Sequence, residues 1–267
     1  LIIILILILI LLYIMALSAY NFHIDPSVIN NIYNLMIDGN SDTFIEHMQH
    51  MRGSERGGHF CYTKNNNDFT VKITSLIQAG LMPGTTSLNS GDFPFTFHTH
   101  PIVINLDENI VDNYPNLISD EDLGGAIVDN FFCNFLDERN ICDKTGNQNI
   151  GGINFFDIVA VPYGLFIYRP NPNYGHKNRT IEENDDECLR IFNHSSTLLP
   201  IYTVSKKNQY FNTTTQKAQL GIQRYIELLQ NNGFLIDFFS WEHAKINGIQ
   251  FVNMLPINSY VDSMCMC

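Results

Sequence analysis

The chain has 267 residues, of which 45% are hydrophobic and 12% aromatic, so it can bury a substantial core. This length fits one large domain or a domain with an extension. The formal net charge of −12 argues against nucleic acid as a partner, because binding to the phosphate backbone needs clustered lysine and arginine. The six cysteines lack Cys-x-x-Cys spacing and do not form a disulfide pattern, which indicates free thiols in a reducing compartment.

The first 14 residues are almost entirely leucine and isoleucine, and the apolar run continues to Ala19. A run of this length reaches the minimum for a membrane-spanning helix. No basic residue precedes it, so it lacks the start of a signal peptide. Two interpretations stay open for residues 1–20: a membrane anchor, or translated upstream sequence in front of a start at Met15.

The elements before residue 100 are predicted from capping residues and hydrophobic periodicity. Asp25 can cap a helix that begins at Pro26, and an apolar stripe continues to Met36 before Gly39. A second short helix is expected over residues 41–51. Runs rich in β-branched and aromatic residues then predict three strands, at residues 58–62, 69–78 and 93–100.

The elements after residue 100 begin with a loop over residues 102–117. A helix is predicted from Ser119 to about residue 137, and a further helix over residues 216–229. The stretch 170–200 is rich in asparagine and proline with an acidic run, and is expected to be a surface insertion. Two hairpins are predicted, one from strands 155–161 and 165–168, the other from strands starting at Phe234 and Ile249 around Asn247-Gly248.

The pair His98 and His100 is the most specific chemical feature of the sequence. Residues two apart in a strand project to the same face, so the two imidazoles are expected to point together. Two imidazoles on one face supply half of a tetrahedral zinc site. By itself, His-x-His is also compatible with two structural histidines.

Ser119 and Asp122 open the next predicted helix and match the spacing of a capping box. A capping role needs no metal. However, a carboxylate in the first turn of a helix is held rigidly and can reach a nearby cation. Together with His98 and His100, Asp122 would complete the three protein ligands of a catalytic zinc site, which leaves one position for water.

Glu55 is the candidate general base. It precedes the strand predicted at residues 58–62, and a carboxylate beside a metal-bound water can accept its proton. Gly57 and Gly58 would allow the backbone to pass close to the site. Taken as a single glutamate, Glu55 is better explained as a solvated turn residue.

Together these residues resemble the JAMM (MPN+) family of metalloproteases. That family combines a glutamate on an early strand, a His-x-His pair often followed by proline, and Ser-x-x-Asp at the start of a helix. The corresponding pieces here, in the same order, are Glu55, His98-Thr-His100-Pro101 and Ser119-Asp-Glu-Asp122. The order of elements is similar as well, and the resemblance covers residues 22–170.

The resemblance implies an α/β (α+β) fold, an MPN-like mixed sheet flanked by helices, with a C-terminal α/β extension. It further implies that His98, His100 and Asp122 bind Zn²⁺, that Glu55 transfers the proton, and that Ser119 hydrogen-bonds the developing oxyanion. The reaction would be hydrolysis of amide or isopeptide bonds. Ubiquitin and ubiquitin-like conjugates are a substrate class of the family, although a shared fold does not fix the substrate.

Four segments are expected on this basis: an apolar N-terminal segment at 1–20, the MPN-like metalloprotease domain at 22–170, an acidic insertion at 171–212, and a C-terminal helix and hairpin at 213–260. Eighteen residues separate His100 from Ser119, more than the family usually has, and this spacer could loop out. Two alternatives stay open: a catalytically inactive MPN-like scaffold, or a membrane-anchored structural protein. Localisation is expected to be cytoplasmic, or at a membrane if the first segment is an anchor.

Overall fold

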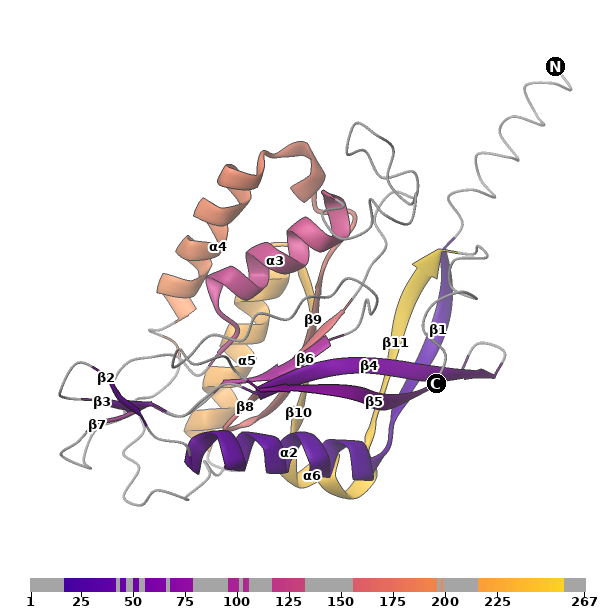
Figure 1. Cartoon of the computed structure of the whole chain (residues 1–267). Coiled ribbons are helices and arrows are strands. Elements are labelled where there is room, and N and C mark those ends of the chain that lie inside the picture. Colours follow the sequence, from indigo (N-terminus) through magenta and orange to yellow (C-terminus); the bar gives the residue numbers. More distant parts are fainter. Residues whose placement is uncertain are drawn as a thin grey trace, which may run out of the picture.

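The computed structural model of the chain describes residues 17–41, 44–46, 50–52, 56–65, 68–78, 96–100, 103–105, 117–132, 156–195, 198 and 216–256. These residues form a mixed sheet of eight strands with helices on both faces, and a separate sheet of three short strands (Figure 1). The architecture confirms the predicted mixed α/β class. No helix within the described residues has the length and apolarity needed to cross a membrane.

The large sheet has the strand order β10-β9-β8-β6-β4-β5-β1-β11. Its strands in chain order are β1 (Leu17–Ile24), β4 (Arg56–Asn65), β5 (Asp68–Gln78), β6 (Thr96–Thr99), β8 (Asp157–Val161), β9 (Gly164–Pro170), β10 (Phe234–Ser240) and β11 (Ile249–Pro256). The pairs β1–β5 and β6–β8 are parallel, and the other pairs are antiparallel. The strand β6, which carries His98, therefore lies in the interior of the sheet.

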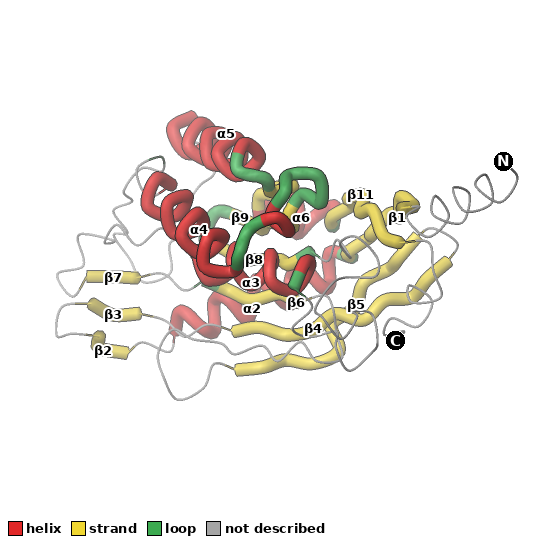
Figure 2. Tube along the Cα trace, turned by 90° about the horizontal axis from the view of Figure 1, so that it is seen from above, coloured by secondary structure: helices red, strands yellow, loops and turns green. Residues whose placement is uncertain are grey.

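Helices cover the large sheet on both faces, as Figure 1 shows. On one face lie α2 (Pro26–Ser41) and α6 (Trp241–Asn247); on the other lie α3 (Asp120–Phe131), α4 (Ile181–Ser195) and α5 (Gln216–Asn231). In the view from above, α4 and α5 run beside each other outside the sheet (Figure 2). Alternate residues of a strand face opposite layers, so each strand contributes to two cores.

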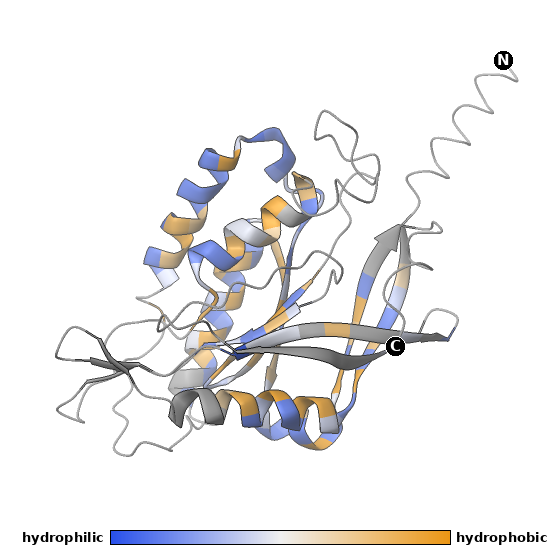
Figure 3. Ribbon diagram, viewed as in Figure 1, coloured by the Kyte–Doolittle hydropathy of each residue, from blue (hydrophilic) through white to orange (hydrophobic). Residues whose placement is uncertain are grey.

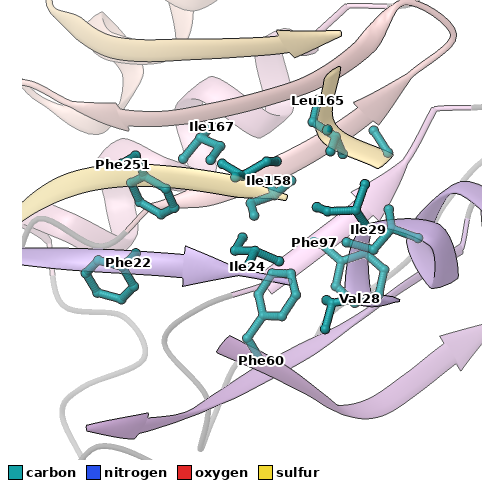
Figure 4. Packing of buried hydrophobic residues seen from close by; sticks show 14 of the residues in the cluster. Phe22, Ile24, Val28, Ile29, Phe60, Phe97, Ile158, Leu165, Ile167 and Phe251 are labelled. Atoms are coloured by element: carbon teal, nitrogen blue, oxygen red, sulfur yellow. The ribbon is translucent and has the colours of Figure 1, made fainter. Parts of the chain in front are cut away.

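The strand β8 illustrates this division of the core. Ile158 and Ala160 pack with the α2 layer, whereas Val159 and Val161 pack with the α3, α4 and α5 layer, and all four are fully buried. Such a continuous apolar run is typical of a strand that is covered on both faces. The core on the α2 side contains many aromatic side chains, and Phe22 packs against Phe156 and Phe251 within it. Figure 4 shows Phe22 and Phe251 in this core.

Several predicted elements are confirmed. The helix from Pro26 is α2, and its buried residues are those of the predicted stripe. The strands expected at 58–62 and 69–78 are β4 and β5, and the third is the short strand β6. The first hairpin is β8 and β9, and the C-terminal helix is α5. The helix after Ser119 is α3, which ends at Phe131; the residues expected to continue it beyond 132 lie outside the described part.

The helix predicted over residues 41–51 is wrong. Helix α2 instead continues to Ser41, past Gly39, and two short strands follow it: β2 (Phe44–Glu46) and β3 (His50–Arg52). They form the three-stranded sheet with β7 (Val103–Asn105), a strand inside the stretch that was expected to be a loop. Pairing between strands that are far apart in sequence decides the structure here, and local periodicity does not report it.

The end of the apolar N-terminal segment belongs to the sheet. Strand β1 begins at Leu17 and lies between β5 and β11. Its residues Tyr20, Phe22 and Ile24 are buried, and Asn21 and His23 between them are more exposed. The segment boundary expected at residue 20 therefore falls inside a strand, and residues 1–16 lie outside the described part.

The second predicted hairpin is wrong. Strands β10 and β11 are the two opposite edges of the large sheet, and α6 separates them along the chain. Asn247-Gly248 ends this helix, and Gly248 has a positive φ of 69°. A positive φ that favours glycine serves a helix end as readily as a hairpin turn. The C-terminal segment is thus part of the central sheet and not an appended hairpin.

The expected surface insertion contains a packed helix. Thr180 and Glu183 form reciprocal hydrogen bonds at the start of α4, in the pattern of a capping box. The hydrophilic and hydrophobic residues of α4 alternate along it (Figure 3), and its buried face includes Cys188 and Ile191. Helix α4 therefore packs against α3 on the same face of the sheet, and most of its acidic residues are exposed.

Candidate metal centre

The strand β6 and the residue after it position the two histidines. Phe97 lies in the core on the α2 side, so its neighbour His98 projects to the opposite face, towards α3. His100 follows the strand, and its backbone N–H donates to the carbonyl of Ala160 at 2.8 Å. This hydrogen bond holds His100 in line with the strand, so both imidazoles lie on the same side.

The start of α3 positions Asp122. Ser119 is the N-cap: its hydroxyl accepts a hydrogen bond from the Asp122 N–H at 3.0 Å. In return, the Asp122 carboxylate accepts one from the Ser119 N–H at 2.8 Å. The predicted capping box is therefore present. It satisfies two N–H groups at the helix end and fixes the direction of the Asp122 side chain.

The three side chains converge on one point. The Nε2 atoms of His98 and His100 are 3.0 Å apart, and each lies 3.2 Å from an oxygen of the Asp122 carboxylate. In the described part of the chain, no other group of histidine, cysteine, aspartate or glutamate is close enough to hold a metal ion. The structure thus brings together the three residues that the sequence predicted as ligands.

The donor atoms are close enough together to share one metal ion. For metal–ligand bonds of about 2.0–2.1 Å, tetrahedral angles place donor atoms about 3.3 Å apart. The two imidazole nitrogens are 3.0 Å apart, each lies 3.2 Å from a different oxygen of Asp122, and one ligand atom from each residue lies within 4.8 Å of the others. The three groups are mostly buried, so water screens their mutual interaction only partly. A cation bound between them would be held by two imidazoles and one carboxylate.

The electrostatics of the site favour a positive charge. Burial raises the pKa of Asp122, but the charges and hydrogen bonds of His98 and His100 outweigh it and hold the pKa well below its ordinary value of 3.8. Asp122 therefore stays ionised in this site. An ionised carboxylate beside two imidazole nitrogens is the arrangement that a divalent cation requires.

A second carboxyl group lies near these ligands on the adjacent strand. The Thr96 hydroxyl donates to an Asp157 oxygen at 2.6 Å, and the two residues are paired across β6 and β8. Burial raises the pKa of Asp157 to about 6, and the negative charge of Asp122 adds to the rise. Asp157 is not among the residues predicted for the site, and its only signal in the sequence is a charged residue at the start of an otherwise apolar strand.

Glu55 lies outside the described residues. The strand that follows it is nevertheless placed beside the ligands: Gly57 pairs with His98, and the Arg56 N–H donates to the Thr99 hydroxyl at 3.0 Å. The main chain directly after Glu55 therefore runs next to the strand that carries the histidines. The predicted role of Glu55 stays a prediction.

Comparisons with protein-family models, with curated proteins and with solved structures found no match to this chain. The basis for a functional conclusion is therefore the geometry of His98, His100 and Asp122, together with the residue pattern around them.

Proposed function

We propose that the chain is a zinc-dependent hydrolase of amide or isopeptide bonds, of the JAMM type. The observation that carries this proposal is the convergence of His98, His100 and Asp122, whose donor atoms lie within 4.8 Å of one another. These residues come from a strand end and a helix start that the sequence pattern of the family pairs in the same way. The mixed sheet with helices on both faces is compatible with an MPN-like fold.

Zinc is the metal that this donor set favours. Two imidazole nitrogens and one carboxylate oxygen are a donor set typical of catalytic zinc sites with three protein ligands. Magnesium and calcium prefer six or more oxygen ligands, which His98 and His100 do not supply. When bound, zinc lowers the pKa of a coordinated water towards 7 and polarises a carbonyl group.

Two side chains would act on the substrate and the water. Ser119 is half-buried, and its oxygen already accepts a hydrogen bond from Asp122. Among the described residues its hydroxyl proton has no acceptor, so the hydroxyl can donate to an oxyanion that develops near the metal. Glu55 would take a proton from the attacking water and pass it to the leaving amine.

The substrate that we propose is a protein conjugate with an extended tail, such as ubiquitin or a ubiquitin-like modifier. The net charge of −12 favours the approach of a partner with a basic face. An extended tail cannot add to β6, which lies inside the sheet. A candidate for the docking strand is β7, an edge strand of the small sheet that begins three residues after His100 in the sequence.

Two measurements test this function. Elemental analysis of the purified protein should find about one zinc per chain, and His98→Ala and Asp122→Ala should each abolish it. Cleavage of di-ubiquitin should then be lost on chelation and return with added zinc. Bound zinc without cleavage of any linkage would leave a metal-binding scaffold or a different peptide substrate. Absence of bound metal at neutral pH would refute the proposal.

A further inference from the structure

The peptide group between Ile118 and Ser119 is hydrogen-bonded on both sides. Its N–H donates to the Asp122 carboxylate at 2.8 Å, and its carbonyl accepts from the hydroxyl of Tyr225 at 3.4 Å. We propose that Tyr225 of the C-terminal helix α5 is a positioning residue for the metal centre. It acts on Asp122 through this single peptide group.

Tyr225 is held firmly enough to act in this way. It is 1% exposed, and its ring lies edge-on to Phe166 of β9, with ring centroids 5.5 Å apart. Its neighbours in the same core include Leu117 and Ile118, the residues directly before the N-cap. A buried tyrosine hydroxyl needs a hydrogen-bond partner, and the carbonyl of Ile118 provides it.

The two hydrogen bonds reinforce each other because they share one planar amide. In a trans peptide the C=O and N–H point in opposite directions, so Tyr225 and Asp122 lie on opposite sides of it. Donation to the carbonyl of Ile118 polarises the amide and strengthens the N–H of Ser119 as a donor. It also fixes the plane of the amide, and with it the direction in which Asp122 is held.

This arrangement is an outer-shell contact of a metal ligand. The Asp122 oxygen that accepts from Ser119 also lies 3.2 Å from His100, and the other oxygen lies 3.2 Å from His98. The charge of Asp122 in turn contributes to the raised pKa of Tyr225, after the larger effect of burial. The inference rests on the proposed metal site, and it assigns part of that site to a segment outside the JAMM-like region.

The test compares Tyr225→Phe with a matched control. Tyr33→Phe removes one hydroxyl from α2 on the opposite face of the sheet, where Tyr33 packs against Trp241. Zinc affinity is measured by competition with a chromophoric chelator. We expect Tyr225→Phe to weaken zinc binding about 10-fold, the lower end of the range for outer-shell partners. Tyr33→Phe should leave the zinc affinity unchanged.

A double-mutant cycle separates positioning from a general loss of packing. The cycle is read from the solvent exchange of the Ser119 amide in the metal-free protein, because Asp122→Ala removes the carboxylate that accepts from this amide. If Tyr225 acts through the hydrogen bond to Asp122, then Tyr225→Phe should speed up this exchange in the wild-type background and have no further effect in the Asp122→Ala background. An equal acceleration in both backgrounds would overturn the inference, and so would unchanged zinc affinity in the single variant. If the wild type binds zinc and Tyr225→Phe binds it with the same affinity, only the positioning role is refuted. The proposed function would stand.

The metal-free protein supplies an independent readout. The amide N–H of Ser119 should exchange with solvent about 10-fold faster in Tyr225→Phe than in wild type or Tyr33→Phe, because its hydrogen bond is weakened. Unchanged exchange at this amide would contradict the inference whether or not the wild type binds zinc.

Discussion

Replacing Asp157 by asparagine should have opposite effects on the stability of the metal-free protein and on metal binding. Asparagine keeps the size of the side chain and an oxygen that can accept from Thr96, but it carries no charge. Asp157 has a pKa of about 6 in the folded protein against an ordinary value of 3.8. Its ionisation is therefore unfavourable in the fold, and the asparagine variant avoids it.

The size of the effect follows from the two pKa values. A raised pKa means that the folded state holds the proton longer, so stability is lost as the pH rises from 3.8 to about 6. At about 1.4 kcal/mol per pH unit, the loss is at most about 3 kcal/mol above pH 6, because Asp157 is partly exposed. Asp157→Asn should recover this amount at pH 7.5.

Urea denaturation with a chelator present, at pH 4.5 and pH 7.5, measures the difference. The stability gained by Asp157→Asn should grow by up to about 2 kcal/mol between these two pH values. Part of the gain is present already at pH 4.5, because in the unfolded chain the carboxyl is mostly ionised at that pH. Asp186→Asn, at an exposed site on α4, is the matched control and should show no such growth. A gain for Asp157→Asn that does not depend on pH would refute the reasoning.

The same substitution should weaken zinc binding. An ionised Asp157 near His98 and Asp122 is unfavourable without a cation and favourable with one, so its removal takes away a charge that attracts the metal. We expect a loss of roughly 10-fold in zinc affinity at pH 7.5. Unchanged affinity would mean that Asp157 is too far from the metal to contribute.

Three further predictions concern the base, a helix end and the N-terminal segment. Glu55→Gln should keep zinc while hydrolysis falls by roughly 100-fold or more, and a parallel loss of metal would instead make Glu55 a ligand. Gly248→Ala should lower the free energy of unfolding by about 1–3 kcal/mol, because Gly248 has a positive φ and an added Cβ would lie 2.5 Å from the carbonyl of Ile24; an unchanged urea midpoint would contradict this. A chain without residues 1–14 keeps β1, which begins at Leu17, and should stay soluble and bind zinc; its aggregation would favour a membrane anchor.

The parts of the fold that the sequence predicted are those in which local signals and tertiary packing agree. Helix α2 has its proline start and its apolar stripe, and β8 and β9 are short apolar runs around Pro162-Tyr-Gly164. The errors occur where one local signal serves two structures. Asn247-Gly248 ends a helix here, and the acidic stretch after Thr180 forms α4, although Thr180 and Glu183 already carried the capping pattern.

The candidate site divides in the same way. The two histidines were predictable because a two-residue spacing has a fixed meaning in a strand, and Asp122 because Ser119 marks the start of its helix. The role of Tyr225 was not predictable. No sequence pattern distinguishes a core tyrosine whose hydroxyl makes a functional hydrogen bond from one that only packs in the core. Its contact with Ile118 spans 107 residues of sequence and exists only in the folded chain.

The position of the C-terminal segment connects stability with the proposed chemistry. Helix α5 and strand β10 follow one another in the chain, and the buried residues of both lie in the core that also contains Leu117 and Ile118. The peptide group between Ile118 and Ser119, which holds Asp122, thus contacts α5. The packing of α5 depends in turn on β10, an edge strand of the sheet. Variants that loosen β10 should therefore weaken metal binding without touching a ligand. The contact between Tyr225 and Ile118 thus connects the start of α3, which holds Asp122, with the C-terminal part of the sheet.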